Sequence, residues 1–146
     1  MTLDVAVLET SFDLIAPRGD ELVDRFYSRL FEKAPATRQL FERVDMDTQK
    51  QSLLATLISV REALRDLPTI VPDLEELGER HVGYGALPEH YPVVASVLIE
   101  TMVELGGADW RPEYSAAWAE ALQTVAGVML RGAARAARTA DTAPAS

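Results

Sequence analysis

The chain has no cysteine among its 146 residues. This excludes disulfides, thiolate-bound metals, iron–sulfur clusters and any cofactor attached through a Cys-x-x-Cys-His sequence. Basic residues are also few, since 14 Lys and Arg stand against 23 Asp and Glu, for a formal net charge of −9. An acidic surface repels phosphate backbones and anionic lipids, so we expect neither nucleic acid nor a membrane as a partner.

Long apolar runs are missing as well. No uninterrupted apolar run approaches about twenty residues. The first residues, MTLDVAVLETSFDL, carry acidic groups where a signal peptide carries Lys or Arg. We therefore expect a cytoplasmic protein, with one domain large enough to bury a core unaided.

Strands with strict apolar alternation are absent, and apolar residues instead recur at helical spacing almost everywhere. The sequence therefore predicts an all-α fold, with helices over about residues 8–15, 22–31, 49–64, 72–81, 92–105 and 112–129 and a short turn through 35–41. Asp20 is the expected cap of the second helix. Asp47 or Thr48 is expected to cap the long third one, where Thr48 and Gln51 are spaced as a capping box.

The domain is expected to end before the end of the chain. The globular part is predicted to cover residues 1–134. From about Arg135 the residues are Ala, Thr, Pro and Ser, with no large side chain to bury. Residues 135–146 are therefore predicted to form a disordered tail.

Two histidines, His81 and His90, lie in the stretch RHVGYGALPEHYP. His81 shares an apolar helix face with Leu74, Leu77 and Gly78, where a single histidine is usually a packed core residue. If its imidazole binds a ligand, the other ring nitrogen needs an acceptor, and the Leu77 carbonyl is one turn back. His90 precedes a helix, where an exposed or capping role is the default.

Two polar side chains lie in otherwise apolar helical stripes. Tyr27 lies between Val23 and Phe31, and a buried tyrosine most often packs its ring and bonds one backbone group. Gln49 leads into an apolar face that continues four residues on at Leu53, although an amide at the start of a helix usually faces solvent.

Taken together these positions indicate a pocket. Three helices can converge with the Tyr27 hydroxyl and the Gln49 amide on one side, the His81 imidazole on the other, and hydrocarbon from Leu53 and Leu57 between. Such a pocket suits a large, flat, apolar cofactor with a central metal.

Five segments occur in an order and spacing that is similar to a known family: FYSRLFEKAPATRQLF, QKQSL, LPTIVPDLEELGERHVGYG, HYPVV and SAAWAEAL. Over residues 5 to 132 the chain resembles bacterial single-domain globins related to the haem domain of flavohaemoglobins. The resemblance implies a globin fold of about six to seven helices around a haem pocket, with haem b bound non-covalently.

The resemblance also implies a role for each candidate residue. His81 would be the iron ligand, Tyr27 and Gln49 the distal hydrogen-bond donors to a bound gas, Leu53 the apolar residue over the iron, and Phe41 the ring that stacks on the haem. The other implied haem contacts are Leu57, Leu77, Tyr84, Tyr91 and Val94, together with Arg43 and Arg80 as partners of the haem propionates.

The implied function is reversible binding of dioxygen, and of CO or NO, at a five-coordinate ferrous iron, in a monomer or homodimer. His90 lies in the proximal bend, so no histidine remains for a second axial ligand. The alternative is a nitric oxide dioxygenase that works with a separate reductase, because the sequence holds no reductase module. A third possibility is a haemless signalling globin that binds another ligand.

One position departs from the family. Flavohaemoglobins link the proximal histidine through a tyrosine to a glutamate in the last helix. Tyr91 matches that tyrosine, but Ala133 stands where the glutamate would be. The imidazole is then less electron-rich, so peroxidase-like chemistry is not expected.

Overall fold

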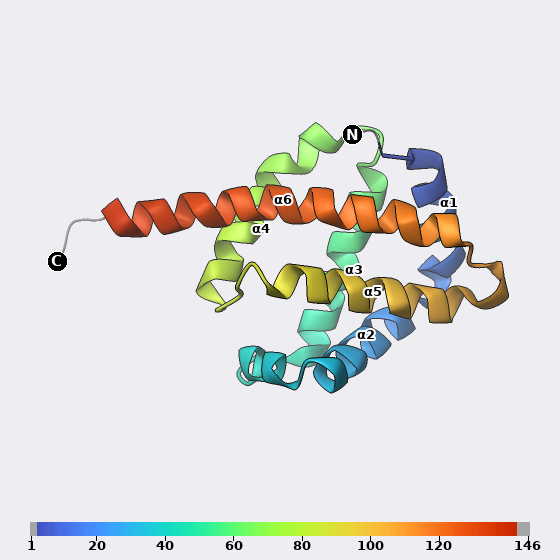
Figure 1. The fold of residues 1–146 in the computed structure, drawn as a ribbon, viewed down its shortest axis with the longest axis horizontal. Coiled ribbons are helices and arrows are strands. Elements are labelled where there is room, and N and C mark those ends of the chain that lie inside the picture. Colours follow the sequence, from blue (N-terminus) through green and yellow to red (C-terminus); the bar gives the residue numbers. More distant parts are fainter. Residues whose placement is uncertain (1–2, 143–146) are drawn as a thin grey trace.

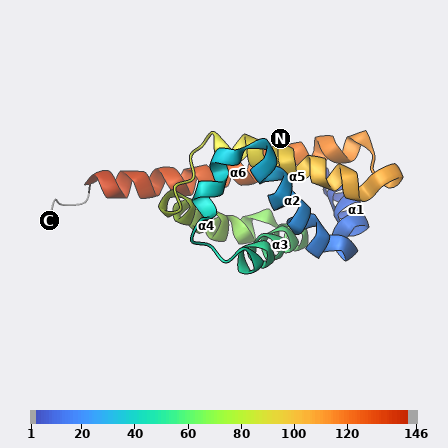
Figure 2. The same ribbon diagram turned by 90° about the horizontal axis from the view of Figure 1, so that it is seen from below.

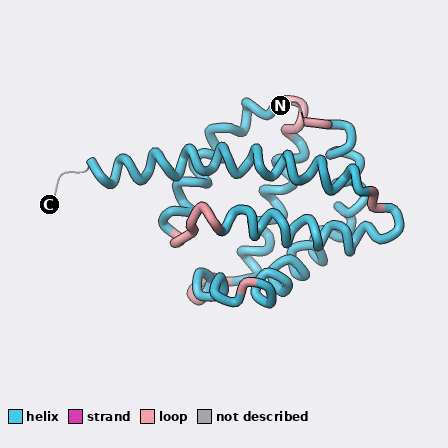
Figure 3. The backbone as a smooth tube through the Cα atoms, in the orientation of Figure 1, coloured by secondary structure: helices cyan, strands magenta, loops and turns pink. Residues whose placement is uncertain are grey.

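The computed structural model describes residues 3–142, with side chains up to residue 138, and this part of the chain is entirely helical apart from short connections (Figures 1 and 3). Its six α-helices are α1 (Val5–Ile15), α2 (Gly19–Lys33), α3 (Met46–Glu62), α4 (Val71–Gly83), α5 (His90–Gly106) and α6 (Pro112–Thr142). The 3-10 turns η1 (Ala16–Arg18), η2 (Pro35–Phe41), η3 (Leu67–Ile70) and η4 (Gly107–Asp109) connect them. The predicted all-α class is confirmed.

The main core lies where α1, α2, α3, α5 and α6 meet. Trp118 of α6 is fully buried at its centre, and its ring lies 5.9 Å from that of Phe12. The indole Nε1 donates a 2.8 Å hydrogen bond to Ser11 Oγ of α1, so the one polar atom of this side chain is satisfied inside the core.

Helix α5 is largely apolar. The stretch His90–Asp109, with a mean hydropathy of 1.2, could cross a membrane by length and composition alone. In the structure α5 packs against α2 and α6 (Figure 1). Its Glu104 forms ion pairs with Arg25 and Arg29 of α2. We interpret it as a core helix of the bundle.

Helices α4 and α6 approach each other so closely that two glycines are needed. A Cβ added to Gly78 of α4 would lie 1.9 Å from the Met129 carbonyl oxygen of α6. A Cβ added to Gly132 of α6 would lie 1.9 Å from the Glu75 carbonyl oxygen of α4. The crossing is therefore a contact between two backbones, made from both sides.

Two predicted helix caps are wrong. Asp45 caps α3: its carboxylate accepts from the Asp47 N–H at 3.2 Å and from Thr48 Oγ1 at 2.9 Å. Asp47 and Thr48 are therefore already helical. Asp20 lies in the first turn of α2, because η1 leads directly into Gly19 and leaves no extended residue to act as a cap.

The end of α6 differs from the predicted tail. The helix continues to Thr142, and its last turns extend past the rest of the bundle (Figure 1). Alanine and arginine favour helix strongly, so RGAARAAR extends α6 without large side chains to bury. Residues 143–146 lie outside the described residues, and the domain boundary at residue 134 stays a prediction.

Candidate functional site

Helix α2 holds Tyr27 in an aromatic environment. The side chain is only 4 % exposed. The ring packs edge-on against Phe26 at 4.9 Å and against Phe41, at the end of η2, at 5.6 Å. These contacts fix the direction of the phenol, and Phe41, the predicted haem-stacking ring, lies directly beside it.

Helix α3 brings Gln49 to the same place. Its backbone N–H bonds to the Asp45 carbonyl at 3.0 Å, which sets it in the first turn of the helix. Its Nε2 donates to Tyr27 Oη at 3.0 Å. Burial raises the pKa of the Tyr27 phenol, and the hydrogen bond from Gln49 opposes this only in part, so the hydroxyl keeps its proton.

Helix α4 carries His81, which is half-buried. Its Nδ1 lies 2.8 Å from the carbonyl oxygen of Leu77, as the sequence predicted. A carbonyl can only accept, so Nδ1 carries the proton and Nε2 keeps its lone pair. Burial lowers the pKa of the imidazole, the bond to Leu77 opposes this, and the charge of Arg80 adds to the lowering. The neutral, metal-binding form is favoured.

Two tyrosines surround His81. The ring of Tyr84, which is 59 % exposed, lies 5.5 Å from the imidazole, and that of Tyr91 lies 6.2 Å away. Tyr91 also packs against the small cluster of Leu74, Val128 and Met129 between α4 and α6. Burial raises the pKa of the Tyr91 phenol.

The other predicted contact residues differ in burial. Leu57 is buried in the main core, where Leu53 of α3 and Val94 of α5 pack at its edge and stay half-buried. Leu77 is half-buried beside the α4–α6 cluster. These apolar side chains retain surface that a bound apolar group could cover.

The remaining polar residues near the site are outside it. Arg43 is exposed in the turn before α3, and Arg80 is exposed and paired with Glu76 at 3.4 Å, so their propionate role stays a prediction. His90 Nδ1 accepts from the Leu87 N–H at 2.9 Å. That bond closes the turn before α5, and His90 is the first residue of the helix and does not cap it.

The described contacts form two groups, a Tyr27–Gln49–Phe41 group and a His81–Tyr84–Tyr91 group. Helix α3, which carries Gln49, packs mainly on α2, whereas α4, which carries His81, packs mainly on α6 (Figure 2). The two sides meet at one end, where a Cβ on Gly85 would lie 3.4 Å from Leu40 of η2.

This donor set fits a haem. Among the described residues no three His, Cys, Asp or Glu side chains gather to hold a metal, so His81 offers a single nitrogen to a metal that must bring other ligands with it. The half-buried surfaces of Leu53, Val94 and Leu77 are apolar, as a porphyrin requires. One imidazole, half-buried apolar side chains and a phenol–amide pair are the groups that the expected cofactor requires.

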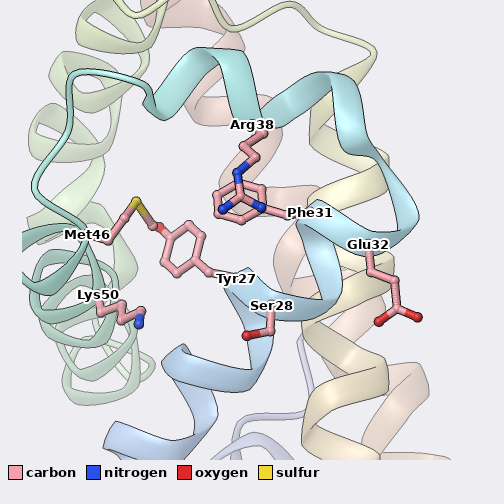
Figure 4. Close-up of a pocket in the computed structure, with 7 residues that line it drawn as sticks. All are labelled: Tyr27, Ser28, Phe31, Glu32, Arg38, Met46 and Lys50. Carbon is pink, nitrogen blue, oxygen red and sulfur yellow. The ribbon is translucent and has the colours of Figure 1, made fainter.

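Two surface hollows lie next to each other on either side of Phe31, Arg38 and Met46. One, of about 450 Å³, is lined by Tyr27, Ser28, Phe31, Glu32, Arg38, Met46 and Lys50 (Figure 4). A second, of about 460 Å³, shares Phe31, Arg38 and Met46 with it. Neither is lined by Gln49 or His81, and Tyr27 lines the first but not the second, which reaches Phe41 instead.

The sequence reasoning did not single out Arg38, Met46 or Lys50, which line this cleft. The Arg38 guanidinium lies over the Phe31 ring at 5.3 Å, and Lys50 pairs with Asp24 at 2.8 Å. Lys50 adjoins Gln49 and could have been noticed for that reason. Arg38 and Met46 are placed by η2 and the turn after it, whose path no periodicity predicts.

Comparison with known proteins places this arrangement in a family. Residues 24–129 match the profile of the globin family. The chain is 25 % identical over 124 residues to a flavohemoprotein of Bacillus subtilis and 28 % identical over 127 residues to one of Bordetella parapertussis. These alignments include 84 % and 86 % of this chain but only 31 % and 32 % of the two relatives. The chain therefore spans about a third of the length of these relatives.

Solved structures share the fold. An engineered carbene transferase derived from a Rhodothermus marinus protein superimposes with a TM-score of 0.85 at 21 % identity, covering 94 % of this chain and 95 % of the other. A bacterial globin from Campylobacter jejuni gives 0.78 at 18 % identity, covering 90 % and 94 %.

Proposed function

Because the chain belongs to the globin family, we propose that it binds haem b non-covalently through His81 and thereby binds dioxygen and other diatomic gases reversibly. The observation that carries the proposal is the bond between His81 Nδ1 and the Leu77 carbonyl at 2.8 Å. It fixes one tautomer, with the proton on Nδ1 and Nε2 as the metal-binding atom, while burial lowers the pKa of the ring and favours its neutral form.

When bound, haem supplies an iron centre at which a diatomic gas coordinates. The chain's part on the opposite side is to donate hydrogen bonds. Tyr27 Oη accepts from Gln49, so its own O–H proton remains available for the gas. Dioxygen gains negative charge when it binds, whereas carbon monoxide gains little, so these donors favour dioxygen.

The surrounding side chains exclude water. Phe41 beside Tyr27 and Leu53 one turn after Gln49 are apolar, and a dry pocket slows loss of the gas as superoxide. His90 is held by Leu87 in the bend before α5, so we expect the iron to keep one protein ligand and an open position. A cytoplasmic monomer or homodimer remains our expectation.

The test is a visible absorption spectrum of the purified protein, oxidised, reduced and reduced with carbon monoxide. We expect a five-coordinate high-spin ferrous spectrum that changes to a six-coordinate one with CO. In His81→Ala we expect the ferrous spectrum to change and haem to be lost on desalting. A protein that stays colourless after haemin is added would indicate a haemless globin. Colour that is unaltered in His81→Ala would show that His81 is not the iron ligand.

The alternative is a nitric oxide dioxygenase with a separate reductase, using the same His81, Tyr27 and Gln49. It is favoured by the likeness to flavohemoproteins, of which this chain matches about a third. The oxygenated protein is mixed with nitric oxide and nitrate is measured over repeated cycles with a cellular reductase fraction. Sustained nitrate formation supports the dioxygenase, whereas one turnover without re-reduction leaves the gas-binding protein.

A further inference from the structure

The two glycine contacts between α4 and α6 lie directly next to the histidine. Gly78 precedes His81 by three residues, and its α-carbon rests on the backbone of Met129. A methyl group there would be about 1.5 Å short of ordinary van der Waals distance from the Met129 oxygen. Gly132 makes the reverse contact on Glu75, one turn earlier in α4.

Gly78 also belongs to the hydrogen-bond acceptor of His81. The peptide unit that joins Leu77 to Gly78 supplies the carbonyl oxygen that accepts from His81 Nδ1 at 2.8 Å. The α4–α6 crossing therefore fixes the position of this peptide, and the orientation of the imidazole depends on that position through the hydrogen bond.

Other contacts hold the same crossing. Leu74 packs with Val128 and Met129, and Tyr91 joins that cluster while its ring lies 6.2 Å from His81. Arg135 of α6 pairs with Glu75 at 3.6 Å and with Glu79 at 3.3 Å. Glu75 is thus held both at its backbone and at its side chain, which leaves α4 little freedom to slide along α6.

We propose that Gly78 and Gly132 are positioning residues for the proximal histidine: by locking α4 onto the α6 backbone they fix the Leu77 carbonyl and so set the orientation of the His81 ring. The inference rests on the proposed haem ligation. A metal-binding histidine is usually oriented by a polar partner. Here two residues without side chains would have that role, through backbone contact alone.

The chain provides matched controls for this test. Gly127 lies in α6 with Gly132, and Gly83 lies in α4 with Gly78, yet a Cβ added at Gly127 or Gly83 meets nothing within 4 Å. Alanine at these two positions adds the same methyl group to the same helices without disturbing the crossing. It should stabilise the helix slightly, because glycine is a poor helix former.

The experiment measures the ferrous iron–histidine stretching band by resonance Raman spectroscopy and the rate of haem loss to an excess of apomyoglobin. Gly78→Ala and Gly132→Ala should shift the band and speed haem loss about tenfold. Gly127→Ala and Gly83→Ala should leave both unchanged. An unshifted band in folded, haem-loaded Gly132→Ala overturns the inference while leaving haem binding itself intact; a wild type without haem overturns the proposed function instead.

A second measurement separates positioning from general damage. In His81→Gly, free imidazole can occupy the place of the lost ring and give its own iron–ligand band. Because this ligand is not tied to α4, adding Gly132→Ala should no longer move the band. An equal shift in this background overturns the inference, since the glycine would then act on the whole pocket.

A milder variant covers the case in which the alanine variants do not fold. Arg135→Gln weakens the same crossing without a steric clash, since it removes the charge that pairs with Glu75 and Glu79. It should move the band from its wild-type position by a smaller amount than a steric clash at the crossing would. A band at the wild-type position in Arg135→Gln, when no alanine variant folds, counts against the inference.

Discussion

Gln49 Nε2 donates a hydrogen bond to Tyr27 Oη at 3.0 Å. This bond links α3 to α2 through two residues that are 22 positions apart in the chain. The phenol oxygen is the acceptor in this bond, so the amide polarises the O–H group in addition to lying beside it. The two side chains therefore form one hydrogen-bonding unit, in which the loss of either member weakens the other.

Removing the phenol hydroxyl should release dioxygen faster. Tyr27→Phe keeps the ring packing with Phe26 and Phe41 and removes only the hydroxyl, which is the donor to the gas and the acceptor from Gln49, so we expect the dioxygen dissociation rate to rise about tenfold, equivalent to about 1.4 kcal/mol. Stopped-flow mixing measures the rate. Carbon monoxide dissociation should change less and serves as the control.

Gln49→Leu should raise the same rate by a comparable or smaller factor. The leucine removes the donor to Tyr27 Oη, yet the phenol keeps its own proton. In the double variant the change in activation free energy of dioxygen dissociation should be smaller than the sum of the changes in the two single variants, because both act through one bond. Unchanged dioxygen dissociation in both single variants would show that neither side chain faces the gas.

Alkaline pH should destabilise the fold through Tyr27. Burial raises the folded-state pKa of this phenol above its usual value of about 10, so above that pH the unfolded chain loses a proton that the folded chain retains. The folded state binds more protons there, and stability falls as pH rises. Chemical denaturation between about pH 9 and about pH 11 should show a shallower decline for Tyr27→Phe than for the wild type. Tyr84→Phe, at an exposed position, should follow the wild type.

The buried Trp118–Ser11 bond should matter more than a similar bond nearer the surface. Ser11→Ala leaves the indole N–H of Trp118 without a partner in a fully buried position and should lower the free energy of unfolding by about 2 kcal/mol. Ser115→Ala removes the equivalent partner of Trp110, whose bond is only partly buried, so water can replace it. Urea denaturation followed by tryptophan fluorescence compares the two, and equal losses would contradict this explanation.

Filling the cleft behind Tyr27 should change how fast ligands enter and leave. Met46 lies beside Tyr27 in this cleft, and Met46→Trp adds bulk to it (Figure 4). If gas passes this way, association and dissociation of carbon monoxide should slow by the same factor, with affinity unchanged. Ile58→Trp, at an exposed position later in α3, is the control for flash photolysis. Rates equal to the wild type would mean that gas takes another path.

The sequence predicts local contacts of the site well. The bond from His81 to Leu77 spans one helical turn, so helix geometry alone places the two atoms within reach, and the structure confirms it. The meeting of Tyr27 and Gln49 was predicted from two apolar stripes and from family resemblance, and their mutual hydrogen bond confirms that they lie together.

Contacts between distant segments were not predictable. The sequence places Gly78 on an apolar helix face. That no side chain fits at this position depends on the Met129 backbone, 51 residues later in the chain, and a local pattern does not show it. The helix starts failed for a related reason. Asp45 and not Asp47 caps α3 because the turn after η2 leaves Asp45 extended, and pattern matching alone does not give the path of that turn.

The acidic residues of α5 run antiparallel to the basic residues of α2: Glu104 meets Arg25 and Arg29, and Glu100 meets Lys33. Exposed ion pairs of this kind contribute little stability each, about 0 to 1 kcal/mol, and less in salt. Both carboxylates of α5 lie on the side of the helix that faces α2, and each meets a cation there. The pairs therefore distinguish the side of the largely apolar α5 that turns toward α2 from its other sides, a distinction that the burial of hydrocarbon alone would leave weak.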